Sequence, residues 1–190
     1  MNLTMETLFG LIIGIGLSAA CGFRVFVPLL GLSLASMTGH LTLGQGFEWI
    51  GSWPAFVAFA TATVFEIGAY YVPWLDHLMD TLTTPAAIVA GTIMTASLVG
   101  NLSPFLKWTL AIIAGGGVAG MVQAGTVLLR GASSATTGGF GNFLVSTGEA
   151  TGSILTTILA LILPVAGLFL VALLCVLIVF KWIRVKNKHA

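Results

Sequence analysis

The chain has very little charge for its length. Of its 190 residues, only 7% are Asp, Glu, Lys or Arg, whereas a soluble domain carries about 25%. Hydrophobic residues make up 57%, and the mean hydropathy is +1.07. This composition excludes an ordinary soluble protein, and it excludes a disordered chain, which needs low hydrophobicity and high charge. A net charge of +1 gives no electrostatic basis for a nucleic-acid partner.

Cysteine pairs and enzyme signatures are also lacking. Cys21 and Cys175 form neither a CxxC pair nor a metal-ligand spacing. The chain contains no HExxH, GxSxG or GxxxxGK[ST] motif. We therefore expect no enzyme activity and no cofactor. Residues 1–20 lack the basic start of a secretory signal, so the first apolar run is expected to be retained as a membrane span.

What the chain has instead is long apolar runs. A membrane span takes ~20 apolar residues, so the sequence predicts an all-α protein with a single transmembrane domain over residues 1–190 and about six spans. The expected spans are 8–37, 53–71, 85–100, 105–129, 143–163 and 164–181. Pro28 is expected to kink the first span. The polar run 131–142 is expected to be a loop or irregular backbone that lines a cavity.

Lys and Arg residues set the expected orientation. They gather in the C-terminal tail, and loops rich in Lys and Arg stay in the cytoplasm. An even number of spans then puts the N-terminus on the same side. We expect a multi-pass protein of the bacterial cytoplasmic membrane with both termini in the cytoplasm.

The two halves of the chain resemble each other. A shift of 100 residues aligns 12–39 with 112–139, with ten identical positions. A lone Glu follows in the next span of each half, and a Pro then opens the last span. This predicts two repeats of three spans, about 7–101 and 105–184, and an odd number of spans turns the second upside down. Inverted repeats are typical of transporters, which bind substrate between them near the middle of the membrane.

Two acidic residues are expected inside the membrane, where a charge costs ~2.5–3.5 kcal/mol. Glu66 shares a helix face with Tyr70. Glu149 lies on a polar stripe with Ser146 and Ser153. These faces predict a site that binds a cation or relays a proton. The alternative is a hydrogen-bonded network that only holds the helices together.

Arginine and amide side chains complete the candidate site. Arg24 is the one cation deep in the first expected span. It is expected to pair with a Glu or to bind an anion. Arg130 is interpreted as an anchor at the membrane surface. Gln123 adds a polar group to a stripe of small residues. Asn142 ends a segment, 136–142, that is a candidate gate.

Asp76, His77 and Asp80 form a weak candidate metal site. Two carboxylates and one imidazole suit a metal only with a further ligand. The interpretation favoured here is a solvated turn that caps the third expected span.

Small residues recur every fourth position in the first expected span, at Gly10, Gly14, Ser18 and Gly22. Such stripes let helices approach closely. They predict that the first and fourth expected spans form the tight core of the bundle.

Three segments together resemble a family of small bacterial integral membrane proteins catalogued as a domain of unknown function (number 4126). They are GLSAACGFRVFVP at 16–28, Glu66 with VPWLDH at 72–77 and Asp80, and ATTGG at 135–139 with Asn142, Ser146 and Glu149. The resemblance implies a polytopic membrane protein without implying an activity. The chain departs from the family at Tyr70-Tyr71, where members often have Asp-Lys, and at Phe143, where they often have Pro.

The leading hypothesis is a small transporter or channel in which Glu66 and Glu149 together bind a cation or proton, with Arg24 as counter-charge. The first alternative is translocation of a lipid or lipid phosphate held by Arg24 and Arg130. The second is a scaffold that transports nothing. The expected partners are the lipid bilayer, a small ion or solute, and a second copy of the chain in a homodimer.

Overall fold

The protein is all-helical. The computed structural model describes residues 5–100 and 102–186, apart from the side chains of 73–74, 76–77, 181–182 and 184–186, and no strand occurs in these ranges. The first half contains α1 (Met5–Cys21), α2 (Phe26–Met37), the short 3₁₀ helix η1 (Glu48–Gly51), α3 (Trp53–Ala69) and α4 (Pro73–Leu98). The second half contains α5 (Pro104–Leu110), the π-helical turn η2 (Ala111–Gly116), α6 (Gly117–Thr137), α7 (Asn142–Ile162) and α8 (Pro164–Lys186).

The first apolar run is a broken helix. The break lies between Cys21 and Phe26. The sequence predicts a kink at Pro28 instead. Pro28 sits in the first turn of α2, where a backbone N–H has no partner within the helix, so proline is tolerated there.

Two further boundaries differ from the prediction. Helix α4 begins at Pro73 and continues through Pro85, so the expected turn around Asp80 is helical. The hydroxyls of Thr83 and Thr84 in this helix donate to the carbonyl oxygens of Met79 and Asp80, one turn before them, at 2.8 and 2.7 Å.

The polar run 131–142 is also mostly helical. Helix α6 continues to Thr137, and only Gly138–Gly141 form the turn into α7. Gly138 ends α6 with a φ of +62°, the left-handed conformation that glycine adopts most readily at a helix end. The expected loop is therefore confined to four residues.

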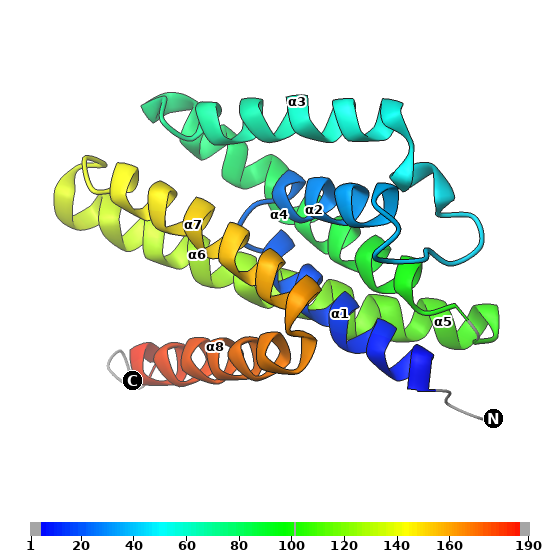
Figure 1. Cartoon of the computed structure of the whole chain (residues 1–190). Helices are drawn as coiled ribbons and strands as arrows, with labels where there is room; N and C mark the ends of the chain where they lie inside the picture. The colour runs from blue at the N-terminus through cyan, green and yellow to red at the C-terminus, as the bar shows by residue number, and fades with distance from the viewer. Residues whose placement is uncertain (1–4, 101, 187–190) are drawn as a thin grey trace.

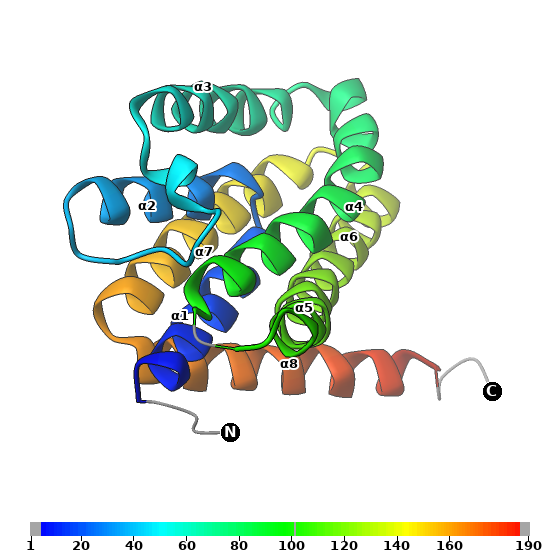
Figure 2. The ribbon, with the colours of Figure 1, turned by 90° about the vertical axis from the view of Figure 1, so that its right-hand side faces the viewer.

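Helix α1 is the centre of the bundle. It packs against α2, α4, α6, α7 and α8. Figures 1 and 2 show α3 and α8 outermost on opposite sides, with the other long helices between them. The core cluster accordingly combines α1 residues such as Leu17 with Leu32 of α2 and Met94 of α4.

The small residues of α1 allow this close packing. A Cβ added to Gly14 would lie 2.9 Å from Cα of Thr95, and one added to Gly16 would lie 2.7 Å from Cβ of Ala160. Ser18 donates to the carbonyl oxygen of Gly91 at 2.7 Å. Gly14 and Ser18 of the stripe thus face α4, whereas Gly22 lies against Ala119 and Val122 of α6, in the fourth apolar run.

Within the described residues, three helices are long and apolar enough to cross a membrane: 78–98, 104–137 and 142–162. The other apolar helices are shorter, and two of them, α1 and α2, are the parts of the broken helix. The second of the three long segments is α5, η2 and α6 joined end to end.

Candidate functional site: a buried centre of two arginines and two carboxylates

The break between α1 and α2 places Arg24 in the middle of the bundle. Its side chain is 1% exposed. Nη2 donates to the carbonyl oxygen and to Oγ of Ser146 in α7, at 3.1 and 2.6 Å. The same nitrogen lies 3.2 Å from Oε2 of Glu149, one turn further along α7. Ser146 and Glu149, two members of the polar stripe of α7, thus both hold Arg24.

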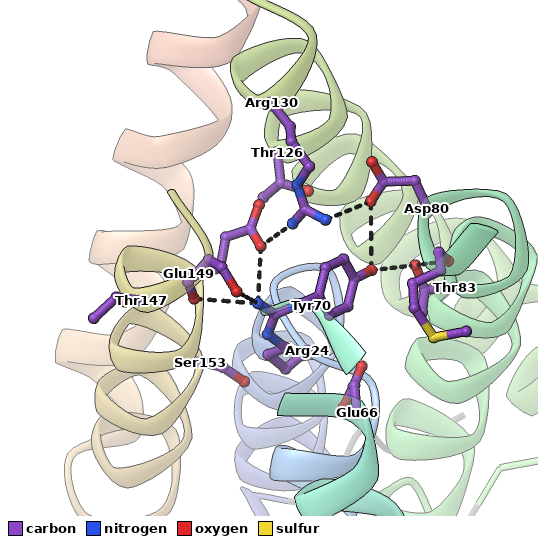
Figure 3. A network of polar contacts seen from close by, with 12 residues as sticks. Arg24, Glu66, Tyr70, Asp80, Thr83, Thr126, Arg130, Thr147, Glu149 and Ser153 are labelled. Carbon is purple, nitrogen blue, oxygen red and sulfur yellow. Dashed lines mark hydrogen bonds and ion pairs between the residues drawn. The ribbon is translucent and has the colours of Figure 1, made fainter. Parts of the chain in front are cut away.

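Glu149 also binds a second arginine. Nη2 of Arg130, in α6, donates to the same Oε2 that faces Arg24. Glu149 and Arg130 are 4% and 3% exposed. One carboxylate oxygen therefore accepts from two guanidinium groups, as Figure 3 shows.

Asp80 and Tyr70 complete the centre. Nη1 of Arg130 donates to Oδ1 of Asp80 at 2.8 Å. Tyr70 follows the last residue of α3. The centroid of its ring lies 3.7 Å from Cζ of Arg24 and 4.1 Å from Cζ of Arg130. Cations bind the face of an aromatic ring favourably, so Tyr70 helps hold both guanidinium groups.

The Tyr70 hydroxyl extends the network towards α6. It lies 2.9 Å from Oγ1 of Thr83 and donates to Oδ1 of Asp80 at 3.4 Å. Gln123 of α6 donates to Oγ1 of Thr83 at 3.2 Å. These contacts connect the C-terminal end of α3 to α4, and α4 to α6.

Glu66 has different partners. Its carboxylate accepts from the backbone N–H groups of Val25 (2.7 Å) and Phe26 (3.0 Å), at the beginning of α2. The first N–H groups of a helix lack partners within the helix and carry partial positive charge, so a carboxylate is well placed there. Glu66 thereby stabilises the break that positions Arg24.

The side chains of two other predicted site residues contact the last turns of neighbouring helices. Ser153 donates to the carbonyl oxygen of Ala20, in the last turn of α1, at 3.0 Å. Asn142, at the start of α7, donates to Oγ of Ser134 at 3.0 Å. Ser153 thus caps the other side of the helix break, and Asn142 fastens the turn between α6 and α7.

The structure changes two of the interpretations made from the sequence. Glu66 and Glu149 bind different donors and do not form a shared pair, because the helix break presents N–H groups to one and arginines to the other. Arg130 is buried in the centre instead of anchoring the membrane surface.

The candidate metal site is described only at Asp80. Asp80 binds Arg130 and Tyr70, while the side chains of Asp76 and His77 lie outside the described part of the chain. Among the described residues, no group of three or more His, Cys, Asp or Glu side chains could hold a metal ion.

One pattern in the sequence points to the missed role of Arg130. Gln123, Thr126 and Arg130 recur at intervals of three and four, which is one face of a helix, and all three are buried. From this stripe Arg130 reaches Glu149 of α7 and Gln123 reaches Thr83 of α4. The contribution of Thr83 has no comparable signal.

The ion pairs between the described side chains of the centre join equal numbers of positive and negative groups. Two guanidinium groups meet two carboxylates, and all four are held by hydrogen bonds. Such an arrangement can hold a negatively charged group between the arginines, and it changes its net charge whenever Glu149 is neutralised.

The fold and the centre define an all-helical protein with apolar helices long enough to cross a membrane and a charged network buried between them. A sequence model of the family described as Domain of unknown function (DUF4126) matches residues 11–184, and the chain belongs to this family. This confirms the resemblance seen in the sequence. Neither a curated protein nor a solved structure matches the chain.

Proposed function

We propose that this chain is a small secondary transporter of the bacterial cytoplasmic membrane, and that Glu149 binds the coupling proton or cation. The observation that supports the proposal is the origin of the groups in the centre. Arg24, Tyr70 and Asp80 belong to the first half of the chain, and Arg130 and Glu149 to the second. A transporter that alternates between two states needs a site that joins its moving parts.

Glu149 is the group on which such a change depends. The groups that face it are Arg24 from the helix break and Arg130 from α6, with Asp80 of α4 and Tyr70 bound to Arg130, and Glu66 beyond Arg24 (Figure 3). A proton or cation on Glu149 cancels its attraction for both arginines. The link between the halves then weakens.

An inverted repeat is part of the proposal. Each half has a helical segment with an irregular turn, followed by two helices: α1–α2, α3 and α4, then α5–η2–α6, α7 and α8. The 100-residue shift aligns Gly39 with Gly139, and both glycines have a left-handed conformation, with φ of +75° and +94°. Agreement at a conformation that few residues adopt supports a common origin of the halves.

Ion-dependent currents in liposomes test the function. The full chain is reconstituted and supplied in turn with protons, Na⁺, K⁺, chloride, phosphate and small organic ions. At least one ion should drive a current above that of empty liposomes, and E149Q should lower it at least about tenfold. E48Q is the matched control, because Glu48 is exposed and accepts only from the nearby N–H of Gly46 among the described contacts.

The other two hypotheses have their own readouts in the same liposomes. Translocation of fluorescent phospholipid without an ion current would favour lipid transport through the same arginines. If neither ions nor lipids move, the transporter proposal is wrong and the centre serves only to hold the helices together.

A further inference from the structure

Arg24 has more hydrogen-bonding capacity than its neighbours use. A guanidinium group has five N–H donors. Nη2 makes contacts with Ser146 and Glu149, whereas Nε and Nη1 have no hydrogen-bond partner among the described residues. Buried donors without partners are costly, more so when the group is charged. Arg24 is thus set up to bind a further acceptor.

Glu149 fits the space between the arginines incompletely. Its Oε2 accepts from both guanidinium groups, while Oε1 is buried and has no hydrogen-bond partner in the described part of the chain. A carboxylate has only two oxygens, and here one of them serves both arginines. A tetrahedral oxyanion presents three or four oxygens and can bind each guanidinium separately, in the paired geometry that arginine forms with phosphate.

The arginines are held in place without Glu149. Ser146 binds Arg24 through its carbonyl oxygen and hydroxyl, Asp80 binds Arg130, and the Tyr70 ring contacts both. If Glu149 is neutral, Arg24 has no ion-pair partner among the described residues, while Arg130 keeps Asp80. Glu66 balances the start of α2 on the other side of Arg24. The pair of guanidinium groups is therefore a preformed, positively charged cradle.

We propose that Arg24 and Arg130 form a binding site for a phosphate-type oxyanion, and that Glu149 occupies this site as an internal competitor when no ligand is bound. The chemistry is shared by inorganic phosphate and by the phosphate of a lipid headgroup. The inference rests on the proposed function in one respect, namely that the bound oxyanion is the transported solute.

Binding of inorganic phosphate to the purified full chain in detergent tests the site. E149Q removes the internal competitor while keeping its shape, so the phosphate affinity should rise at least about tenfold over wild type. R24Q and R130Q should each abolish saturable binding. K107Q is the matched control, because Lys107 is another cation of the bundle that contacts Phe47 and not the centre. It should bind like wild type.

A gain of affinity in E149Q is a result that misfolding does not produce, so the test does not depend on how well R24Q and R130Q fold. A second arm uses nanodiscs with phosphatidic acid or with diacylglycerol, which lacks the phosphate. Binding of phosphatidic acid with the same variant pattern, and none of inorganic phosphate, would assign the site to a lipid headgroup.

The opposite results overturn the inference. It is wrong if neither probe binds, or if wild type, E149Q and K107Q bind both probes equally. The two proposals can fail separately. If a cation carries current but phosphate does not bind, the transporter proposal stands and the oxyanion-site proposal is wrong. If phosphate binds but nothing is transported, the oxyanion site stands and the transporter proposal is wrong.

Discussion

Glu66 and Glu149 are two buried carboxylates with contrasting surroundings. Each lies in the helix that follows the irregular helical segment of its half, and they are 5% and 4% exposed. Glu66 uses both oxygens, and its donors are backbone N–H groups that do not move independently of α2. Glu149 uses one oxygen, and its donors are two side chains with other partners of their own.

The difference separates a structural carboxylate from one that can change state. A carboxylate at the start of a helix stabilises the folded state independently of any transport activity. A carboxylate between two independently anchored arginines can leave without dismantling its surroundings. The proposal thus gives the same residue type two roles at similar positions in the two halves, and the variants below test this assignment.

Arg130→Gln should have the largest effect on stability. The substitution leaves Glu149 with Arg24 alone and takes the guanidinium partner from Asp80. Removing one partner of a buried ion pair costs about 3–5 kcal/mol. Unfolding of the detergent-solubilised protein by a denaturing detergent measures the change. Lys107 is only half-buried and has no ion pair among the described residues, so Lys107→Gln should change the free energy of unfolding by less than about 1 kcal/mol. An equal loss in both variants would contradict the burial of Arg130.

Glu66→Ala should have the next largest effect. It leaves the N–H groups of Val25 and Phe26 without their acceptor, at about 1–3 kcal/mol for each unsatisfied donor. Glu66→Gln keeps one acceptor oxygen and should lose about half as much. The same unfolding assay orders the three proteins. If alanine and glutamine are equally harmless, Glu66 does not stabilise the start of α2.

Gly22→Ala tests the helix break that presents donors to both carboxylates. A Cβ at Gly22 would lie 2.6 Å from the carbonyl oxygen of Ala119 and 2.6 Å from Cβ of Val122. The added methyl group forces a backbone shift, at a cost of about 1–3 kcal/mol. Gly68→Ala, in α3, meets nothing within 4 Å and should be neutral or stabilising by up to about 1 kcal/mol. Similar free energies of unfolding for both variants would contradict the close contact of the break with α6.

Tyr70→Phe should have the smallest effect. It removes the hydroxyl contacts with Thr83 and Asp80 but keeps the ring beside both arginines. The loss should be about 0.5–1.5 kcal/mol, the usual contribution of a hydrogen bond. Tyr70→Leu also removes the ring face and should cost more and weaken phosphate binding. Equal phosphate affinity in the phenylalanine and leucine variants would show that the ring does not hold the cradle.

The helical nature of the fold follows from the sequence because apolar runs of membrane length leave few alternatives. The break in the first run does not follow, because it depends on Glu66, whose carboxylate comes from another helix to bind the N–H groups of Val25 and Phe26. Pro28 draws attention to the wrong position, since a proline in the first turn of a helix does not disturb it.

The polar stripe of α7 makes Ser146, Glu149 and Ser153 predictable as a group, because their spacing is that of one helix face. Their partners are less predictable. That Glu149 meets Arg130, and that Asp80 joins them, depends on how α4, α6 and α7 pack, which spacing within one helix does not determine. The short turn between α6 and α7 is not predictable either, because the polar composition of 131–137 is typical of a loop although these residues are helical.

In the proposal Glu149 can change state, whereas Glu66 keeps its two backbone donors throughout. The phosphate affinities of E149Q and E66Q, measured side by side with wild type, test this most directly. E149Q should bind phosphate at least about tenfold more tightly than wild type, and E66Q should stay within about twofold of wild type. An equal change of affinity in the two variants, or none in E149Q, would contradict it.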